Sequence, residues 1–340
     1  MTTFKEISGQ LIRTLSSDPT PASTYEGQIW YNSTIGVLKG NTFTAAAWSS
    51  GGALGTARIG LQGAGTQTAL LGFGGRTPAP PPTGASVVAT EEYNGTSWSP
   101  GGNLNTARRY FAGCGTQTAG LAVSGWDNNN NYLNSTEKYN GSTWTTSTVL
   151  PYSARSIFGC GTQTDALVAG GYTSPLIGSS VTSTNEFDGS SWTGGGNMLN
   201  PRVAASAVGT TTAGLIWGGN TPNPSGAGDL NNTESYNGTS WTTVNAQVNL
   251  RSASGGRAGT QASALAFLGN PGSTSLVTEE WDGTNWAVNP ATLAQARTDT
   301  GSDGNTTAAI GAGGYGSATY LGVTEEYNAA FYSTKTLTTS

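Results

Sequence analysis

Short apolar runs alternate with glycine-rich polar turns along most of this chain. Six of the runs follow the same kind of small-residue turn and begin at equivalent alanines, namely Ala69, Ala119, Ala166, Ala213, Ala264 and Ala308. Apolar or alternating runs of roughly four to eight residues, bounded by Gly, Asn and Ser, predict β-strands rather than helices. The pattern therefore predicts an all-β protein that consists of many short strands.

A motif close to T-E-x-[YFW]-[ND]-G-x-x-W recurs along the chain. Its tryptophans fall 45 to 49 residues apart, at Trp98, Trp144, Trp192, Trp241 and Trp286. An arginine follows each polar turn after a tryptophan, at Arg58, Arg108, Arg155, Arg202, Arg251 and Arg297. Two more strands, joined by a turn such as GTQT, fit between each arginine and the next motif, so each repeat contains about four strands. This period and strand number are typical of a β-propeller blade, and six arginines indicate six blades.

The repeat resembles that of kelch proteins over residues 42–332. The shared features are a Gly-Gly pair after the second strand, as at Gly74 and Gly170, then an aromatic residue, a tryptophan and a basic residue. The chain departs from the usual pattern in having Asn-Gly or Asp-Gly where many relatives have Asp-Pro, and one glycine of the pair is replaced at Ser124 and Asn270. The resemblance implies a six-bladed kelch-like β-propeller with four-stranded blades.

The repeats are out of phase with the chain ends. Trp48 precedes the first complete repeat, and no tryptophan follows the last motif at 324–328. We expect residues 42–48 to supply the fourth strand of the last blade and to close the ring. Bringing together such distant ends costs about 5 kcal/mol, which is comparable with the net stability of a domain, so deleting residues 37–48 should abolish cooperative unfolding. Alternatively, a C-terminal strand around Tyr332 supplies the closing strand.

These considerations divide the chain into three parts. Residues 1–41 form an N-terminal arm, residues 42–332 form the propeller, and residues 333–340 form a C-terminal tail.

Composition narrows the possible functions. The chain has no histidine, which excludes Ser-His-Asp triads and histidine-based metal centres such as the copper site of kelch-type galactose oxidase. A net charge of −5 argues against nucleic-acid binding. The chain lacks an apolar run long enough for a membrane-spanning helix, and MTTFKEISGQLIRTL is unlike a signal peptide. We therefore expect a protein that is not an enzyme, has no cofactor and does not insert into membranes.

A glutamate stands two residues before the repeat aromatic in five repeats, at Glu91, Glu137, Glu234, Glu279 and Glu325, and the third repeat has Asn185 instead. Two interpretations remain open. Each glutamate either pairs with a repeat arginine or lies on a solvated outer face. Because these carboxylates recur with the repeat, we interpret them as scaffold and not as a glycosidase pair.

Three other features have a structural and a functional interpretation. Cys114 and Cys160 occupy equivalent positions, and two buried thiols are favoured over a disulfide. The three Asn-Gly-Ser/Thr sequences are formal glycosylation sites, but tight turns are favoured at Asn94, Asn140 and Asn237. The acidic and amide run 127–131 lacks a suitably spaced glutamate, so a solvated loop is favoured over a calcium site.

The loops after the second strands vary in length, from about 7 residues to about 14. Length variation on one face favours a binding face. Candidate binding residues in these loops are Arg76, Trp126, Asn129, Tyr132, Tyr172, Tyr315 and Tyr320. Aromatic side chains among Asn, Gly and the proline run 78–82 suit a carbohydrate or protein surface. Alternatively, each of these residues anchors its own loop.

The segment EGQIWYNSTIGVLKG at 26–40 resembles a short segment near the start of structural proteins of tailed bacteriophages, particularly marine ones, in which kelch-like blades also occur. The resemblance implies a virion component present in several copies, whose arm contacts neighbouring virion proteins through Ile29, Trp30 and Tyr31. Alternatively, the arm packs on its own propeller.

We therefore expect a bacteriophage structural protein of the tail, a fibre or the capsid surface, located in the virion, with a propeller that contacts protein or host-surface glycan. A cellular kelch adaptor or lectin is the alternative, and a glycan-degrading enzyme is the least favoured.

Overall fold

The computed structural model describes residues 12–20, 28–78, 84–173, 181–221, 228–252, 255–269, 276–316 and 318–337. These residues form strands, turns and loops without an α-helix, so the all-β prediction is confirmed. In this part of the chain, accordingly, there is no apolar helix of membrane-spanning length. The chain forms two compact units: unit 1 comprises Met1–Ala47 and Ala329–Ser340, and unit 2 comprises Trp48–Asn328.

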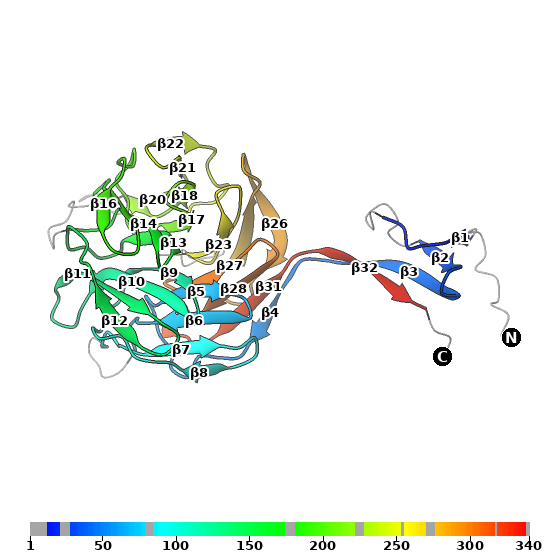
Figure 1. Ribbon diagram of the computed structural model, residues 1–340, viewed down its shortest axis with the longest axis horizontal. Helices are drawn as coiled ribbons and strands as arrows, with labels where there is room; N and C mark the ends of the chain where they lie inside the picture. Colours follow the sequence, from blue (N-terminus) through cyan, green and yellow to red (C-terminus); the bar gives the residue numbers. More distant parts are fainter. Residues whose placement is uncertain are drawn as a thin grey trace. The chain divides into compact units, whose positions relative to one another are not determined.

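The described part of unit 2 contains six four-stranded antiparallel sheets, numbered here along the chain (Figure 1). Sheet 1 contains β5 (Gln62–Thr66), β6 (Ala69–Phe73), β7 (Thr90–Tyr93) and β8 (Trp98–Pro100). Sheet 2 contains β9 (Ala112–Thr116), β10 (Ala119–Trp126), β11 (Tyr132–Tyr139) and β12 (Trp144–Ser147). Sheet 3 contains β13 (Phe158–Thr162), β14 (Asp165–Ala169), β15 (Thr184–Phe187) and β16 (Trp192–Gly194).

Sheets 4 to 6 repeat this arrangement. Sheet 4 contains β17 (Ser206–Gly209), β18 (Gly214–Trp217), β21 (Thr233–Tyr236) and β22 (Trp241–Val244). Sheet 5 contains β23 (Gly256–Thr260), β24 (Ser263–Phe267), β25 (Val277–Trp281) and β26 (Trp286–Thr292). Sheet 6 contains β27 (Gly301–Gly304), β28 (Ala308–Ala312), β31 (Thr324–Asn328) and β4 (Ala47–Gly51). Two short ribbons pair β19 (Asn220–Thr221) with β20 (Gly228–Asp229) and β29 (Tyr315–Gly316) with β30 (Thr319–Tyr320).

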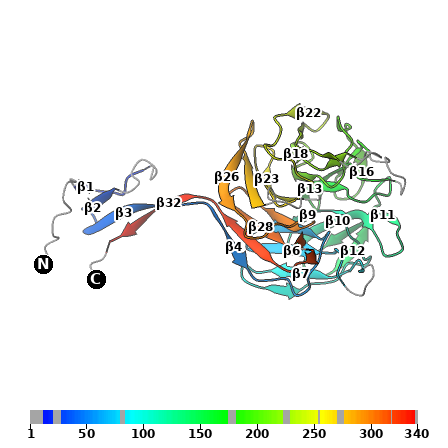
Figure 2. The same ribbon diagram turned by 180° about the vertical axis from the view of Figure 1, so that it is seen from behind.

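The first strands of the six sheets lie together in the middle of unit 2, as their labels in Figure 1 show, and the view from behind in Figure 2 agrees. Each contacts the first strand of the next sheet, and β27 of sheet 6 contacts β5 of sheet 1. Small residues allow this close approach. A Cβ atom added at Gly63 on β5 would lie 2.6 Å from the backbone nitrogen of Ser302 on β27. The Gly- and Ala-rich composition of these strands is therefore a packing requirement.

The fourth strand of sheet 6 comes from the N-terminal side of the repeats. The Trp48 ring on β4 lies 5.4 Å from the Tyr327 ring, much as Trp98 lies 5.0 Å from Tyr93 in sheet 1. The predicted range of this strand, 42–48, is wrong. Residues 42–44 instead belong to β3 of unit 1, where Thr42 pairs with Ser333, so their backbone groups already have partners. The alternative closing residue, Tyr332, also lies in unit 1.

The tryptophans connect neighbouring sheets. On each fourth strand, the indole nitrogen of the tryptophan donates a hydrogen bond, 2.8 to 3.3 Å long, to the hydroxyl of the motif threonine in the preceding sheet. The donor and acceptor pairs are Trp98–Thr324, Trp144–Thr90, Trp192–Thr136, Trp241–Thr184, Trp286–Thr233 and Trp48–Thr278. The motif aromatic on each third strand is buried beside the tryptophan of its own sheet. The repeated motif therefore packs each sheet against the next.

The Asn-Gly sequences form the predicted tight turns. The Asn94 side-chain oxygen accepts hydrogen bonds from the backbone nitrogens of Thr96 and Ser97. Gly95 has φ +91°, a conformation that favours glycine. The same side-chain hydrogen bonds recur at Asn140 and Asn237.

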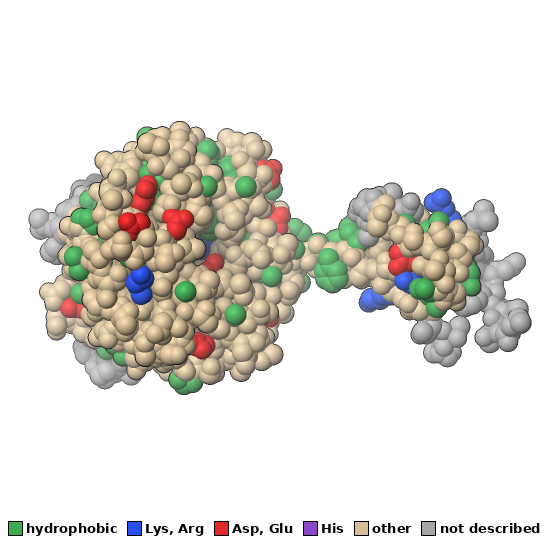
Figure 3. All heavy atoms as spheres, in the orientation of Figure 1, with side chains coloured by type: hydrophobic (Ala, Val, Ile, Leu, Met, Phe, Trp, Pro, Cys, Tyr) green, Lys and Arg blue, Asp and Glu red, His purple; other side chains and the backbone are tan. Residues whose placement is uncertain are grey.

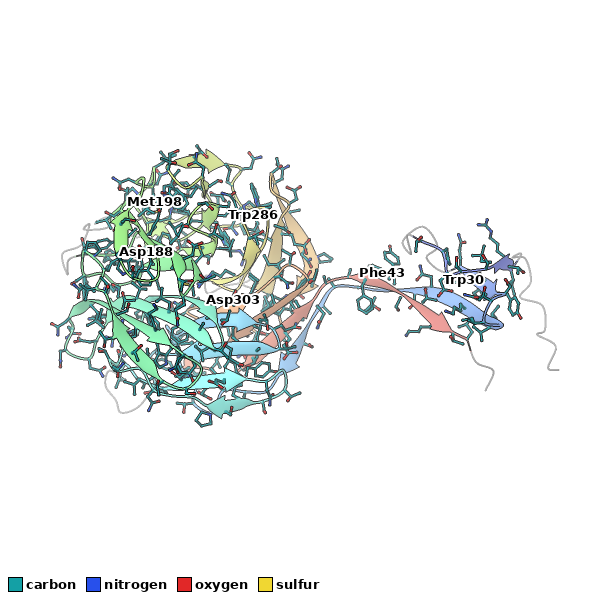
Figure 4. All side chains as sticks on the ribbon, viewed as in Figure 1. Trp30, Phe43, Asp188, Met198, Trp286 and Asp303 are labelled. Carbon is teal, nitrogen blue, oxygen red and sulfur yellow. The ribbon has the colours of Figure 1, made fainter. Side chains whose placement is uncertain are left out.

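Unit 1 contains one small sheet in the order β1 (Arg13–Leu15), β2 (Ile29–Asn32), β3 (Val37–Thr44) and β32 (Phe331–Thr336). Trp30, labelled in Figure 4, is buried, and its indole nitrogen donates to Asp18. The same carboxylate pairs with Lys39 at 2.7 Å. Of the three candidate arm contacts, Trp30 therefore belongs to the core of unit 1, Ile29 is half-buried, and Tyr31 is 40% exposed.

Candidate binding surface

The recurring glutamates and arginines pair inside the sheets. Five salt bridges join an arginine that precedes the first strand to a glutamate on the third strand of the same sheet, at Arg58–Glu91, Arg108–Glu137, Arg202–Glu234, Arg251–Glu279 and Arg297–Glu325. Both partners are buried in every pair. The pairing hypothesis is confirmed for these five sheets.

The Arg202–Glu234 pair in sheet 4 illustrates the local chemistry. The N···O distance is 2.6 Å, and the guanidinium also donates to the backbone oxygens of Gly218 and Asn232. Burial lowers the pKa of Arg202, and the Glu234 charge opposes this shift. A buried charge is tolerated only when it is paired and hydrogen-bonded, as it is here. These pairs are thus part of the scaffold.

Sheet 3 has neither member of the pair. The backbone oxygen of Ala154 accepts the hydrogen bond of Gly125, as that of Arg108 accepts from Gly75. Ala154 therefore occupies the repeat position, and the assignment of Arg155 to that position is wrong by one residue. The carboxylate position is Asn185 in the same sheet. Losing both charges together avoids the large cost of leaving one buried and unpaired.

Arg155 instead lies in a group of aromatic side chains. Its guanidinium carbon is 4.7 Å from the Trp126 ring centre, 4.8 Å from that of Tyr172 and 5.5 Å from that of Tyr132. Its Nε donates a 3.0 Å hydrogen bond to the Tyr132 hydroxyl. Arg109 lies over the same Trp126 ring at 4.1 Å. We call Arg109, Trp126, Tyr132, Arg155 and Tyr172 the arginine–aromatic cluster.

The cluster lies at the end of unit 2 where first strands begin and second strands end. We call this the loop end. In sheets 1, 2, 3, 4 and 6, isolated β-bridges join a residue before the first strand to a residue at or after the end of the second strand, including Arg109 to Trp126 and Arg155 to Tyr172. The equivalent bridge in sheet 1 joins Ile59 to Arg76. The backbone is thus similar from sheet to sheet at this end, whereas the side chains differ.

A second group of candidate residues lies at the same end on sheets 6 and 1. The Arg76 guanidinium carbon is 5.9 Å from the centre of the Tyr320 ring. The Tyr320 ring contacts Tyr315 edge-on at 5.9 Å, and Tyr315 is 39% exposed. We call Arg76, Tyr315 and Tyr320 the tyrosine group.

Arg76, from the second group, is close enough to the arginine–aromatic cluster for its charge to affect Arg109. Burial lowers the pKa of Arg109, and the positive charges of Arg76 and Arg155 add to this shift. Within the described residues, Arg109 and Arg155 form no salt bridge with a carboxylate. Arg109 is held instead by the Ser86 hydroxyl at 2.6 Å. The loop end therefore brings Arg76, Arg109 and Arg155 close enough for their charges to interact, with the Asp127 charge acting on Arg109 in the opposite direction.

Residues in the left-handed conformation surround the centre of the loop end. Gly60, Tyr110, Ser156, Ala204 and Asp299 have φ between +51° and +61°. The backbone nitrogens of the first four each donate to the carbonyl of the equivalent residue in the preceding sheet, at 2.7 to 3.1 Å. Burial raises the pKa of Asp299 to about 7. It also raises that of Tyr110, as does the nearby Asp299 charge.

Asn129 lies at an exposed loop tip. Its backbone nitrogen donates to Asp127 Oδ1, as does that of Asn131, so this carboxylate is engaged by its own loop. Asn128 fixes the loop to sheet 1 through hydrogen bonds in both directions with the Ser86 backbone. Of the proline run only Pro78 is described. Residues 79–83 and Asn270 lie outside the described residues.

A second candidate site is a cavity of about 140 Å³ among the first strands, where Asp303 lies (Figure 4). Cys114, Cys160, Arg257 and Asp303 contribute to its lining. Both thiols are free, as the sequence favoured, and burial raises the pKa of Cys160 to about 12. Arg257 donates to the Gly113 carbonyl at 2.7 Å. The cavity contains opposite charges but no activated nucleophile.

Sequence reasoning thus identified Arg76, Trp126, Tyr132, Tyr172, Tyr315 and Tyr320, and the structure places them in two groups at one end. It missed Arg109 and the position of Arg155. The consecutive arginines at 108 and 109 were the available signal, because only one of them can occupy the repeat position. Charged side chains are sparse on the face of unit 2 seen in Figure 3, which makes a cluster of arginines unusual on this molecule.

No protein-family model matches this chain, and no curated protein matches its sequence.

Proposed function

We propose that unit 2 is a six-bladed kelch-like β-propeller whose ring is closed by β4. Three observations support this architecture. Each sheet has four strands, the first strands contact one another in cyclic order, and the tryptophan–threonine hydrogen bonds run from each sheet to the preceding one, including from sheet 1 to sheet 6.

We further propose that the chain is a non-enzymatic structural protein of a tailed-bacteriophage virion, in which the propeller displays its loop end for contacts with protein or host-surface glycan. One observation carries the binding role. The repeated arginines and glutamates neutralise each other inside the sheets, whereas Arg109 and Arg155, beside aromatic rings at one end, form no salt bridge with any carboxylate that the structure describes.

The virion location rests on the resemblance of residues 26–40 to phage structural proteins. Unit 1 supports an assembly role, because its strands and the turn between β2 and β3 carry large apolar side chains that are 40 to 56% exposed, namely Tyr31, Ile35, Phe43 and Phe331. Such side chains favour burial against other virion proteins. Several copies per particle would follow from this role.

Mass spectrometry of gradient-purified phage particles tests the proposal. The chain should be present in stoichiometric amounts with tail or capsid proteins. If the protein is instead found only in the soluble fraction of cells, the alternative applies, namely a cellular kelch adaptor or lectin. The observation that favours this alternative is the group of arginines and aromatic side chains at the loop end, and it requires no role for unit 1.

A further inference from the structure

We propose that the loop end binds the carboxylate groups of an acidic polysaccharide, with Arg155 as the charged contact. This inference rests on the proposed binding role of the loop end and adds the chemical class of the ligand.

In the described part of the chain, all five repeat arginines have a glutamate within hydrogen-bonding distance, whereas Arg109 and Arg155 form no salt bridge with a carboxylate. Burial and the charges of Arg76 and Arg155 lower the pKa of Arg109, whereas the nearby Asp127 charge raises it. A bound anion would reduce the repulsion between these guanidinium groups. Charge complementarity therefore favours an anionic ligand over a neutral one.

The aromatic rings fix the orientation of Arg155. Its guanidinium carbon lies within 5.5 Å of three ring centres, and among the described residues only its Nε donates a hydrogen bond, to the Tyr132 hydroxyl. A guanidinium carries five N–H donors in a planar fork, so four remain for a ligand. That fork matches the two oxygens of a carboxylate. Because the ring contacts already restrict the side chain, less rotamer freedom is lost on binding.

The neighbouring tyrosines suit a sugar ring. Tyr315 is 39% exposed and contacts Tyr320, over which Arg76 lies at 5.9 Å. An aromatic face beside a cation matches a uronic acid residue, which combines an apolar ring face with a carboxylate. A repeating acidic polysaccharide would present such residues to both groups at the loop end. This combination of ring and charge favours a carboxylated glycan over a phosphate polymer.

Binding of the full-length chain to immobilised polygalacturonate tests the inference, with carboxyl-reduced polygalacturonate as the matched neutral polymer and a glycerol-phosphate teichoic acid as the phosphate polymer. We expect binding to polygalacturonate that weakens as salt is raised, and little binding to the reduced polymer. Arg155→Gln should weaken binding roughly tenfold to a hundredfold, since hydrogen bonds to charged groups are the strong ones.

Arg13→Gln is the matched control, because it makes the same charge change at an exposed position in unit 1. Its binding should equal that of the unaltered chain, and the melting temperatures of both variants should be alike. Tyr315→Ala, also at an exposed position, should weaken binding to polygalacturonate without removing the preference over the reduced polymer.

Three results would overturn the inference: equal binding to the acidic and reduced polymers, binding to the phosphate polymer alone, or equal effects of Arg155→Gln and Arg13→Gln. The absence of binding to every carboxylated polymer in a wider set that includes alginate and hyaluronate would also overturn it. These results leave the proposed virion role standing if purified particles contain the chain. Conversely, carboxylate binding by a chain absent from particles would refute only the virion role.

Discussion

The buried Arg202–Glu234 pair offers the sharpest test of how the repeat is stabilised. Replacing Glu234 with Asn leaves the Arg202 charge buried and removes an attraction of about 6 kcal/mol at 2.6 Å, for an effective dielectric constant of about 20. It also leaves the backbone nitrogen of Leu199, which donates to Glu234 Oε2, without that acceptor. Relaxation reduces the net loss, so we expect the free energy of unfolding to fall by about 3 to 5 kcal/mol.

The chain itself suggests the compensating change. Sheet 3 has Ala154 and Asn185 at the two equivalent positions, so the double variant Arg202→Ala/Glu234→Asn reproduces in sheet 4 a combination that the fold already accepts. Arg202→Ala alone should leave a buried carboxylate and cost a similar amount to Glu234→Asn. The double variant should be substantially more stable than the sum of the two single effects predicts.

Urea unfolding, followed by tryptophan fluorescence, measures all three variants, since the chain contains 10 tryptophans. The coupling free energy should be at least about 2 kcal/mol in the direction of rescue. Additive effects, or single substitutions that each cost less than about 1 kcal/mol, would refute the claim that these buried charges depend on each other.

Three further predictions follow from single side chains. Trp48→Ala should lower the free energy of unfolding by about 2 to 4 kcal/mol, because the half-buried ring contacts Tyr327 and Phe267 and its indole nitrogen donates to Thr278. Phe43→Ala, at an exposed position, should have little effect. Equal effects in thermal unfolding would contradict the role of β4 in closing sheet 6. Asp299 has a raised pKa of about 7 in the folded state. Its ionisation therefore lowers the free energy of unfolding as pH rises above the unfolded pKa near 3.8, and the loss reaches its full size above pH 7. Asp299→Asn should therefore gain stability relative to the unaltered chain between pH 4 and pH 8, by about 1 to 3 kcal/mol because the side chain is half-buried, and parallel stability curves over that range would contradict this. Cys114 and Cys160 are buried with raised pKa values, so a thiol reagent at pH 8 should label neither until the protein unfolds, and rapid labelling of the folded chain would show that the cavity is open.

Much of the sheet structure was predictable because every position of the repeated motif has a structural task. The threonine accepts from a tryptophan, the first glutamate pairs with an arginine, and Asn94-Gly95 forms a turn. These tasks depend on local spacing, which a single sequence reveals through repetition. The repeat also separated the scaffold from the variable loops that carry Arg76 and Trp126.

The predictions that were wrong concerned features that depend on backbone conformation or on pairing between strands that are far apart in the sequence. Arg155 was misplaced because spacing alone does not identify the left-handed residue that follows, which is Ser156 here and Tyr110 in sheet 2. The boundary at 42–48 failed because β3 pairs with β32, almost 300 residues away in sequence, and no local pattern marks that contact. The encounter of Arg109 with Trp126 likewise depends on a bridge between two loops.

The central claim is that the repeated residues hold the sheets together while the non-repeated arginines and aromatics at the loop end bind a ligand. Hydrogen exchange of the full-length chain with and without polygalacturonate tests this claim most directly. We predict slower exchange in segments 74–78, 109–111, 124–132, 154–156, 171–173 and 318–321, which contain or adjoin the arginine–aromatic cluster and the tyrosine group, and unchanged exchange in the GTQT turns at the opposite end of the sheets. Protection confined to those turns, or no change anywhere at a saturating polymer concentration, would contradict the account.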